Sequence, residues 1–311
     1  MLSLSCILLA FLAASVSGST QICGEVSSTT TKSGRYTYLT EVVATDNSGA
    51  QCISVTIDDD TSQNTTSFAA TWEWNSSGDN KSITHSFPNV NLNLPSVLPV
   101  RVDNISLFPV TNQYALYSGN KVSTVGSTSA KDLQDTDVVA AVYLNIFLDA
   151  DRDAAQNATT ATHAVMVWQA SYGNIRPPGW DTTSTTQPTV TMAGIQYTLY
   201  AGQNTINQTV YSWWPNQNIS SLTALDVSPL LNYLWRKVYI PSDIYVGAVQ
   251  WGNDARHSNK NVTFDVSTFG VNIMKGTPVK AIGAGEKSRK APTFSGLVLV
   301  VIGAVIMFDF Q

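Results

Sequence analysis

The sequence predicts an all-β protein, a two-sheet antiparallel sandwich with one short α-helix. Many short runs rich in β-branched and aromatic residues are separated by Gly, Asn and Ser, which is typical of strands joined by turns. Only the segment from Asp226 to Leu234 has the character of a helix, with Pro229 near its start. Removal of both ends from the 311-residue chain leaves about 250 residues, a reasonable size for one domain of this class.

The N-terminal segment has the composition of a secretory signal peptide. Leu2 to Val16 is an apolar run that ends in small residues suited to signal peptidase. We therefore expect residues 1–18 to be removed and the folded domain to span residues 19–275.

The C-terminal segment, residues 276–311, has the pattern of a glycosylphosphatidylinositol (GPI) anchor signal. The small residues Gly283 to Gly285 are followed by the charged spacer Glu286 to Lys290 and the apolar run Leu297 to Phe308. A transmembrane helix needs about 20 apolar residues, and Asp309 ends this run too early. We favour a lipid anchor, with a simple tail anchor as the alternative. Either one would hold a secreted protein at the cell surface or cell wall.

The cysteines and the glycosylation sequences agree with secretion. Cys6 leaves with the signal peptide, so Cys23 and Cys52 remain as an even pair in an oxidising compartment. Eight Asn-x-Ser/Thr sequences predict N-glycosylation. They begin at Asn64, Asn75, Asn80, Asn104, Asn157, Asn207, Asn218 and Asn261.

Charge and residue spacing argue against several other functions. A net charge of −5 with 13% charged residues is unsuited to nucleic acid, whose binding needs clustered basic residues. Asp149, Asp151 and Asp153 are spaced as in a calcium loop, but Ala154 and Thr160 stand where Gly and Glu are required. The histidines are too dispersed for a zinc site. We expect no metal and no cofactor.

Strand alternation assigns the residues from 164 to 172 to two faces of a sheet. One of these faces has the character of a sugar-binding floor. The first carries Ala164, Met166, Trp168, Ala170 and Tyr172, and the second carries Val165, Val167, Gln169 and Ser171. On the preceding strand, Asn145 shares a face with Tyr143 and Phe147.

These strands resemble glycoside hydrolase family 12, the fungal and oomycete endo-β-1,4-glucanases and xyloglucanases. His163 to Trp168 is similar to the family's Tyr-Glu-(Ile/Leu)-Met-(Ile/Val)-Trp, and Tyr172-Gly173 and Pro177 to Gly179 follow in the same frame. Val249 to Asp254 is similar to its Val-Gln-x-Gly-Thr-Glu. The resemblance implies a two-sheet antiparallel β-jelly roll, a concanavalin-like sandwich, with a concave cleft.

Further motifs place the other elements in the same frame. Gln196 to Asn204 and Val210 to Trp213 are similar to two family strands, and we expect the single helix near Leu222 to Trp235. Residues Gly119 to Thr136 are polar and patternless, which indicates an insertion in a loop. Cys23 and Cys52 match the N-terminal disulfide of the family in position and spacing.

The resemblance implies that the catalytic positions hold substituted residues. Retaining glycosidases need two carboxylates about 5 to 5.5 Å apart, one as nucleophile and one as acid/base. The family's nucleophilic Glu falls on Ala164, the Asp that bonds it falls on Asn145, and the acid/base Glu falls on the shorter Asp254. Loss of a covalent nucleophile commonly lowers the rate by a factor on the order of 10⁵. We therefore expect a catalytically degenerate member.

Substrate binding is predicted at Met166, Trp168, Trp213 and Trp251, because sugars bind to aromatic faces and a few polar groups. About half of the tryptophans are expected to pack in the core instead. The family's distal-cleft Trp falls on Val43, which indicates weaker glucan affinity than in active relatives.

Three functions are compatible with this pattern. The first is a non-catalytic surface protein that binds β-glucan or xyloglucan, or that acts as a decoy for proteins recognising active glucanases. The second is an active endo-β-1,4-glucanase with a displaced nucleophile, and the third is a structural cell-wall glycoprotein. Hydrolysis assays separate the second from the others, and glucan pull-down separates the first from the third.

Overall fold

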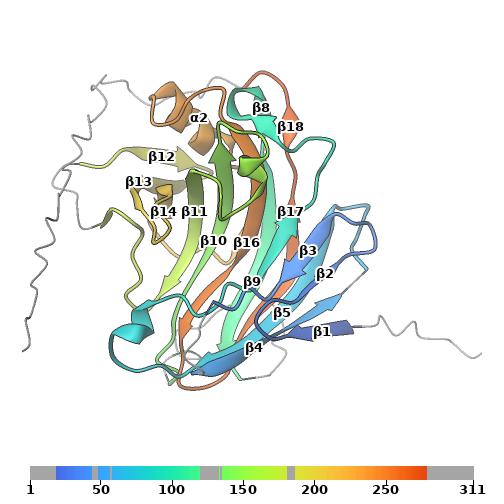
Figure 1. Ribbon diagram of the computed structural model, residues 1–311, viewed down its shortest axis with the longest axis vertical. Coiled ribbons are helices and arrows are strands. Elements are labelled where there is room, and N and C mark those ends of the chain that lie inside the picture. The colour runs from blue at the N-terminus through green and yellow to red at the C-terminus, as the bar shows by residue number, and fades with distance from the viewer. Residues whose placement is uncertain are drawn as a thin grey trace, which may run out of the picture.

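The protein folds as two large β-sheets with a short α-helix, α2 (Ser228–Arg236), at one end (Figure 1). This computed structural model describes residues 19–278, apart from 44–47, 57, 120–132, 134 and 181–185. The all-β jelly-roll prediction is confirmed. No helix within those ranges is long and apolar enough to cross a membrane, and the predicted signal peptide and most of the anchor segment lie outside them.

The strands form a six-stranded sheet A and a ten-stranded sheet B. In spatial order, sheet A contains β1 (Ser19–Cys23), β4 (Gly49–Thr56), β5 (Thr65–Trp74), β17 (Val262–Val271), β9 (Pro109–Ser118) and β15 (Ser221–Asp226). Sheet B contains β12 (Thr189–Met192), β13 (Ile195–Gln203), β14 (Thr209–Pro215), β11 (His163–Tyr172), β10 (Val139–Asp149), β16 (Tyr245–His257), β6 (Asn89–Leu92), β3 (Tyr36–Leu39) and β2 (Ser28–Thr30), with β7 (Val100–Arg101) paired to β16. The small elements are β8 (Ile105–Leu107) paired with β18 (Met274–Lys275), and the 3₁₀ turns η1 (Gly78–Ser82), η2 (Val102–Asn104) and η3 (Ala154–Gln156).

Within the described residues, every strand pair is antiparallel except β11 with β14, which run parallel. The sequence predicted antiparallel sheets and gave no indication of this parallel pair. A parallel pair needs a long crossover connection, which here includes β12 and β13.

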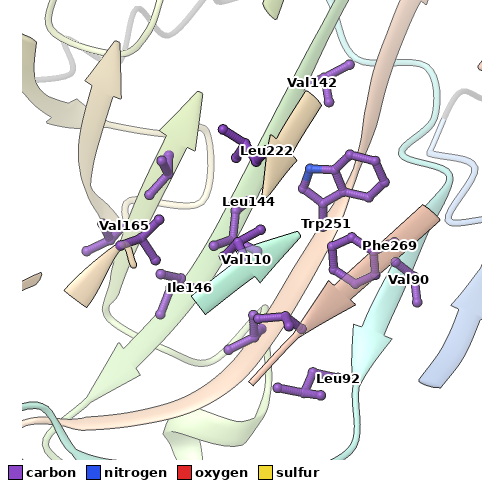
Figure 2. Close-up of a cluster of buried hydrophobic side chains, with 14 of the residues drawn as sticks. Val90, Leu92, Val110, Val142, Leu144, Ile146, Val165, Leu222, Trp251 and Phe269 are labelled. Carbon is purple, nitrogen blue, oxygen red and sulfur yellow. The ribbon is translucent and has the colours of Figure 1, made fainter. Parts of the chain in front are cut away.

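The core lies between the two sheets, where alternate residues of each strand meet. On β10, Val142, Leu144 and Ile146 face inward (Figure 2). Trp251 of β16 is fully buried in this core and stacks on Phe269 of β17, with ring centroids 4.7 Å apart. The intervening residues of β10, β11 and β16 therefore lie on the opposite side of sheet B, which we call the outer face.

The disulfide prediction is confirmed. Cys23 on β1 lies directly opposite Cys52 on β4, and the two sulfur atoms are bonded at 1.98 Å. The bond attaches the first strand to its neighbour at the edge of sheet A.

The helix begins later than the sequence predicted. Leu222 and Leu225 belong to β15, which pairs with β9 and directs both side chains into the core. The carboxylate of Asp226 then accepts the Ser228 N–H at 3.0 Å, where the helix starts. The first residues of the predicted helix therefore form a strand, because they pair with β9.

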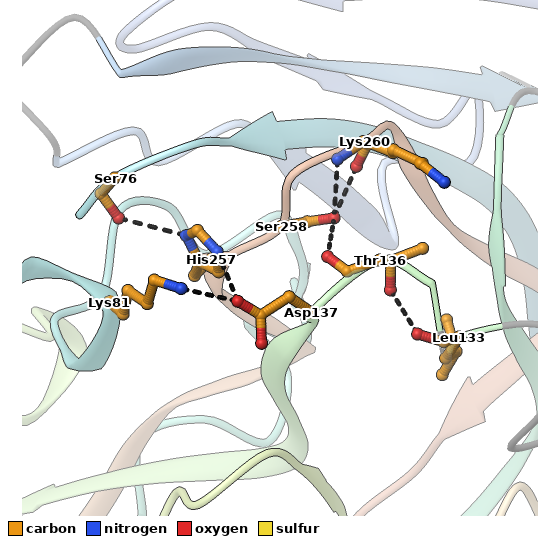
Figure 3. Close-up of polar contacts among 8 residues, drawn as sticks. All are labelled: Ser76, Lys81, Leu133, Thr136, Asp137, His257, Ser258 and Lys260. Atoms are coloured by element: carbon orange, nitrogen blue, oxygen red, sulfur yellow. Dashed lines mark hydrogen bonds and ion pairs between the residues drawn. The ribbon is translucent and has the colours of Figure 1, made fainter. Parts of the chain in front are cut away.

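The predicted insertion from Gly119 to Thr136 is attached at both ends to the connection between β16 and β17. The Gly119 N–H donates to the Asn261 carbonyl at 2.6 Å, and the Asn259 N–H donates to the Thr136 carbonyl at 3.0 Å. Next to it, the Asp137 carboxylate lies 2.6 Å from Lys81 Nζ and 3.4 Å from His257 Nε2 (Figure 3). Most of the insertion lies outside the described residues.

Candidate active site

The row of the outer face that contains Ala164 is apolar. Ala164 on β11 pairs with Phe147 on β10, which pairs in turn with Ala248 on β16. Ala164 is 2% exposed and packs with Phe147, Ala161 and Val210. No side chain in this cluster carries an oxygen.

The second row is polar. Asn145 lies between Met166 and Gln250, as the register of β10 with its two neighbours requires. Oδ1 of Asn145 is buried without a hydrogen-bond partner among the described residues, and so is the hydroxyl of Ser212, which pairs with Met166. Buried polar atoms are normally satisfied, so this row has hydrogen-bonding capacity that a hydroxyl group could use.

The third row is aromatic and closely packed. Tyr143 lies between Trp168 and Gly252, and its ring centroid is 5.1 Å from that of Trp168. Phe87 stacks on Tyr143, also at 5.1 Å. A Cβ at Gly252 would lie 2.3 Å from the Pro88 carbonyl oxygen, so only glycine allows this approach. Trp168 is 1% exposed, and the protein's own side chains therefore cover it.

Asp254 lies beyond this row, opposite Ala141, and is engaged in an ion pair. It is 1% exposed, and its Oδ2 accepts hydrogen bonds from Arg256 Nε at 3.0 Å and Nη2 at 2.8 Å. Arg256 Nη1 also donates to the Ser82 carbonyl at 2.6 Å, which holds the guanidinium in place. Both N–H groups donate to the same oxygen, and Oδ1 of Asp254 is buried without a hydrogen-bond partner among the described residues. Burial raises the pKa of the neighbouring Tyr143, and the charge of Asp254 raises it further.

Glu41 is a second carboxyl group near this face, and the sequence analysis did not single it out. Its Oε2 accepts a 2.6 Å hydrogen bond from Asn89, which pairs with Gly252. Burial raises the pKa of Glu41 to about 7, against the opposing effect of that hydrogen bond. The backbone of Glu41 is left-handed, with φ of 44°, a conformation that costs energy for a residue with a side chain. A lone Glu in a turn is ordinarily solvated, so no sequence signal marks it.

A β-bulge moves the last residues of β11 off the face predicted for them. The register shifts between Val142 and Tyr143, which leaves Gln169 as the extra residue. Beyond the bulge, Ala170 and Tyr172 pack against the core. The alternation argument was therefore correct up to Trp168 and wrong for these two residues.

Trp213 and Trp251, predicted to bind substrate, are core residues. Both are 0% exposed, and Trp213 packs edge-on against Tyr233 of α2 at 5.5 Å. Successive strand residues point to opposite faces, so Trp214 takes the outer face and Trp213 cannot. Met166 is on the outer face and is partly exposed.

Asp149, the first residue of the acidic stretch that was compared with a calcium loop, holds the backbone of that loop. Asp149 accepts the Asp151 N–H through Oδ1 and the Thr162 N–H through Oδ2, each at 2.8 Å. In the described part of the chain, no group of three or more His, Cys, Asp or Glu is placed to hold a metal ion.

Comparison with known proteins assigns the family. The profile of Glycosyl hydrolase family 12 matches residues 41–274. The chain belongs to glycosyl hydrolase family 12. It is 26% identical over 263 residues to xyloglucan-specific endo-β-1,4-glucanase A of Emericella nidulans, covering 84% of this chain and 94% of that protein. It is 28% identical over 276 residues to a probable xyloglucan-specific endo-β-1,4-glucanase A of Aspergillus fumigatus, covering 88% and 99%.

Solved family 12 structures have the same fold. Endoglucanase 3 of Trichoderma harzianum superposes with a TM-score of 0.65 at 24% identity, covering 82% of this chain and 98% of that one. The family 12 xyloglucanase of Bacillus licheniformis gives 0.62 at 17% identity, covering 82% and 100%. The alignment spans nearly the whole length of both solved proteins, so this chain has their fold.

Proposed function

We propose that this family 12 protein binds β-1,4-glucan or xyloglucan at the cell surface without hydrolysing it. The observation that carries the proposal is the apolar row around Ala164, at the position where the resemblance puts the nucleophile. A methyl group in an apolar cluster cannot attack an anomeric carbon. The relatives' names supply the substrate class, β-1,4-glucans and xyloglucan among them.

The other two catalytic positions support the same conclusion. Retaining hydrolysis needs an acid that protonates the leaving oxygen. The Asp254 carboxylate is bonded to Arg256 and is 1% exposed, so a glycosidic oxygen has no access to it. Asn145 provides an amide in the row next to that of Ala164, where the resemblance puts a carboxylate. The Tyr143 phenol does not substitute for a nucleophile, because its raised pKa keeps it protonated.

We also propose the setting in which this binding takes place. The signal-peptide and anchor patterns at the two ends favour a secreted, GPI-anchored protein at the cell surface or cell wall. There it would hold glucan chains or act as a decoy for proteins that recognise active glucanases.

Two assays on the purified, glycosylated ectodomain test the proposal. Xyloglucan and mixed-linkage β-glucan are incubated with the protein and reducing ends are counted, and insoluble glucan is used for pull-down. We expect no turnover above a blank and retention on the glucan. Turnover would refute the non-catalytic proposal, and a protein that neither hydrolyses nor binds would be the structural glycoprotein.

The alternative function is an active endo-β-1,4-glucanase, which the names of the relatives favour. Glu41 adds one structural observation, because a carboxyl with a pKa of about 7 is in the range of a general acid. If this alternative holds, hydrolysis should be lost in Asp254→Asn or in Glu41→Gln.

A further inference from the structure

Three aromatic side chains from three elements meet on the outer face beside Trp168. Trp180 follows β11, Tyr200 lies on β13 and Trp214 lies on β14. The ring centroids are 4.6 Å apart for Trp180 and Tyr200, and 5.5 Å apart for Trp180 and Trp214. The guanidinium carbon of Arg176 lies 4.7 Å from the ring of Trp180. We call these four residues the aromatic platform.

The platform continues an aromatic row but differs from the rest of it in exposure. Trp214 lies 4.9 Å from Trp168, which leads on to Tyr143. Trp168 is 1% and Tyr143 8% exposed, whereas the three platform rings are partly exposed and Arg176 is exposed. A ligand can therefore reach the aromatic surface at the platform and not at Trp168.

The platform is not a part of the core that happens to reach the surface. Its neighbours along the strands, Leu199 and Trp213, face the core between the sheets. Strand alternation then puts Tyr200 and Trp214 on the solvent side. The large aromatic rings gathered on that side form a partly exposed apolar patch, and such patches mark binding surfaces.

Backbone contacts hold Trp180 against Tyr200. A Cβ on Gly179 would lie 2.0 Å from the Ala201 carbonyl oxygen, and a Cβ on Gly202 would lie 2.6 Å from the Gly179 nitrogen. The loop thus lies directly on β13 at a place where both partners must be glycine. Gly179 also has a φ of 85°, which favours glycine. The platform is consequently pre-formed, which lowers the entropic cost of binding.

We infer that the aromatic platform binds a β-1,4-linked glucan chain, with pyranose rings lying flat on Trp180 and Tyr200. All ring substituents of β-linked glucose are equatorial, so each sugar presents a flat C–H face that matches an aromatic ring. Arg176 supplies donors for hydroxyl groups at the edge. This inference rests on the proposed glucan binding and assigns it to residues outside the catalytic positions Ala164, Asn145 and Asp254.

The test is isothermal titration calorimetry, in which cellohexaose or a xyloglucan oligosaccharide is added to the glycosylated ectodomain. Trp180→Ala and Tyr200→Ala should each weaken binding about tenfold or more, as expected for loss of a stacking ring. Trp180→Tyr should retain most of the affinity, and Arg176→Ala should weaken binding about threefold. Arg236→Ala is the matched control, because Arg236 lies over Trp235 on α2 at 5.0 Å in a similar pair.

The outcomes distinguish this inference from the proposed function. Equal affinity of wild type and all platform variants would overturn the platform while leaving glucan binding intact. Absence of binding by the wild type would overturn both. Trp180→Ala could disturb the loop, so two milder variants serve as a check. Arg176→Ala and Trp180→Tyr keep aromatic rings at all three positions. Both must melt like the wild type, and their affinities must follow the predicted order, with Trp180→Tyr binding more tightly than Arg176→Ala. A loss shared with Arg236→Ala would also overturn the inference.

Discussion

At the residue scale, the apolar surroundings of Ala164 determine what a reconstruction of the active site requires. Ala164→Glu would place a carboxyl among Phe147 and Val210, where ionisation is costly. We expect this variant to melt at a lower temperature and to show no turnover. The triple variant Ala164→Glu, Asn145→Asp, Asp254→Glu is the appropriate gain-of-function test, since such coupled groups are not additive. Activity in the single variant would contradict this account.

The ion pair of Asp254 with Arg256 should contribute to the stability of the fold. Arg256→Met leaves the carboxylate of Asp254 buried and unpaired, which should cost about 3 to 5 kcal/mol. The double variant with Asp254→Asn should recover part of the loss, because no charge remains. Arg101→Met is the control, since the Arg101–Asp103 pair is exposed and should contribute under about 1 kcal/mol. Urea unfolding measures all three, and equal losses in Arg256→Met and Arg101→Met would contradict the prediction.

Glu41 should make stability depend on pH. Its pKa is raised from 4.5 to about 7, so the folded protein holds a proton that the unfolded chain has lost. The stabilisation of the folded state by this bound proton is complete below about pH 4.5 and is lost as the pH rises through 7. The difference corresponds to about 3 kcal/mol. The groups that interact with Glu41 are Asn89, which donates a hydrogen bond to it, and the phenol of Tyr143, whose pKa the charge of Glu41 helps to raise.

Glu41→Gln is the variant that checks this dependence. The amide has no proton to lose, so its melting temperature should fall less than that of the wild type between pH 5 and 8. Thermal melts across that range, compared with Glu25→Gln as a control, measure the effect. Parallel curves for wild type and Glu41→Gln would show that Glu41 does not titrate in this range.

At the element scale, periodicity was sufficient to predict the strands and the faces up to Trp168. It failed at Ala170 because a bulge adds one residue and reverses the faces, and a period of two contains no sign of that addition. It also could not separate Trp213 from Trp214, since either phase is possible for two adjacent aromatic residues. The partner of Asp254 was also missed, although Arg256 lies two residues further along β16 and strand alternation places both side chains on the same face.

Close strand approach at Gly252 gives a prediction for β16. Gly252→Ala would put a Cβ 2.3 Å from the Pro88 carbonyl oxygen and 2.7 Å from Asn89, so the edge with β6 must move. We expect a loss of about 2 kcal/mol or more in unfolding free energy. Gly270→Ala should cost less, because its nearest atom is a methyl carbon of Thr65 at 2.9 Å. The reverse order in urea unfolding would contradict the packing argument.

At the scale of the whole molecule, the two sheets and the disulfide could be predicted from motifs and composition. The covering of Trp168 by other side chains could not be predicted, because it depends on segments distant in sequence, such as Phe87 stacking on Tyr143.

All eight predicted glycosylation asparagines are exposed, which is compatible with modification of each. Glycosylation itself stays a prediction.

The last prediction concerns attachment to the cell. Small residues at Gly283 to Gly285, a charged spacer and a short apolar run predict cleavage and transfer to a GPI lipid. Phosphatidylinositol-specific phospholipase C should release the protein from membranes, with an N-terminus near Ser19. Replacement of Gly283 to Gly285 by bulky residues should abolish release, because transfer requires small side chains. If no protein is released and mature peptides extend to Gln311, the chain is attached by its own tail.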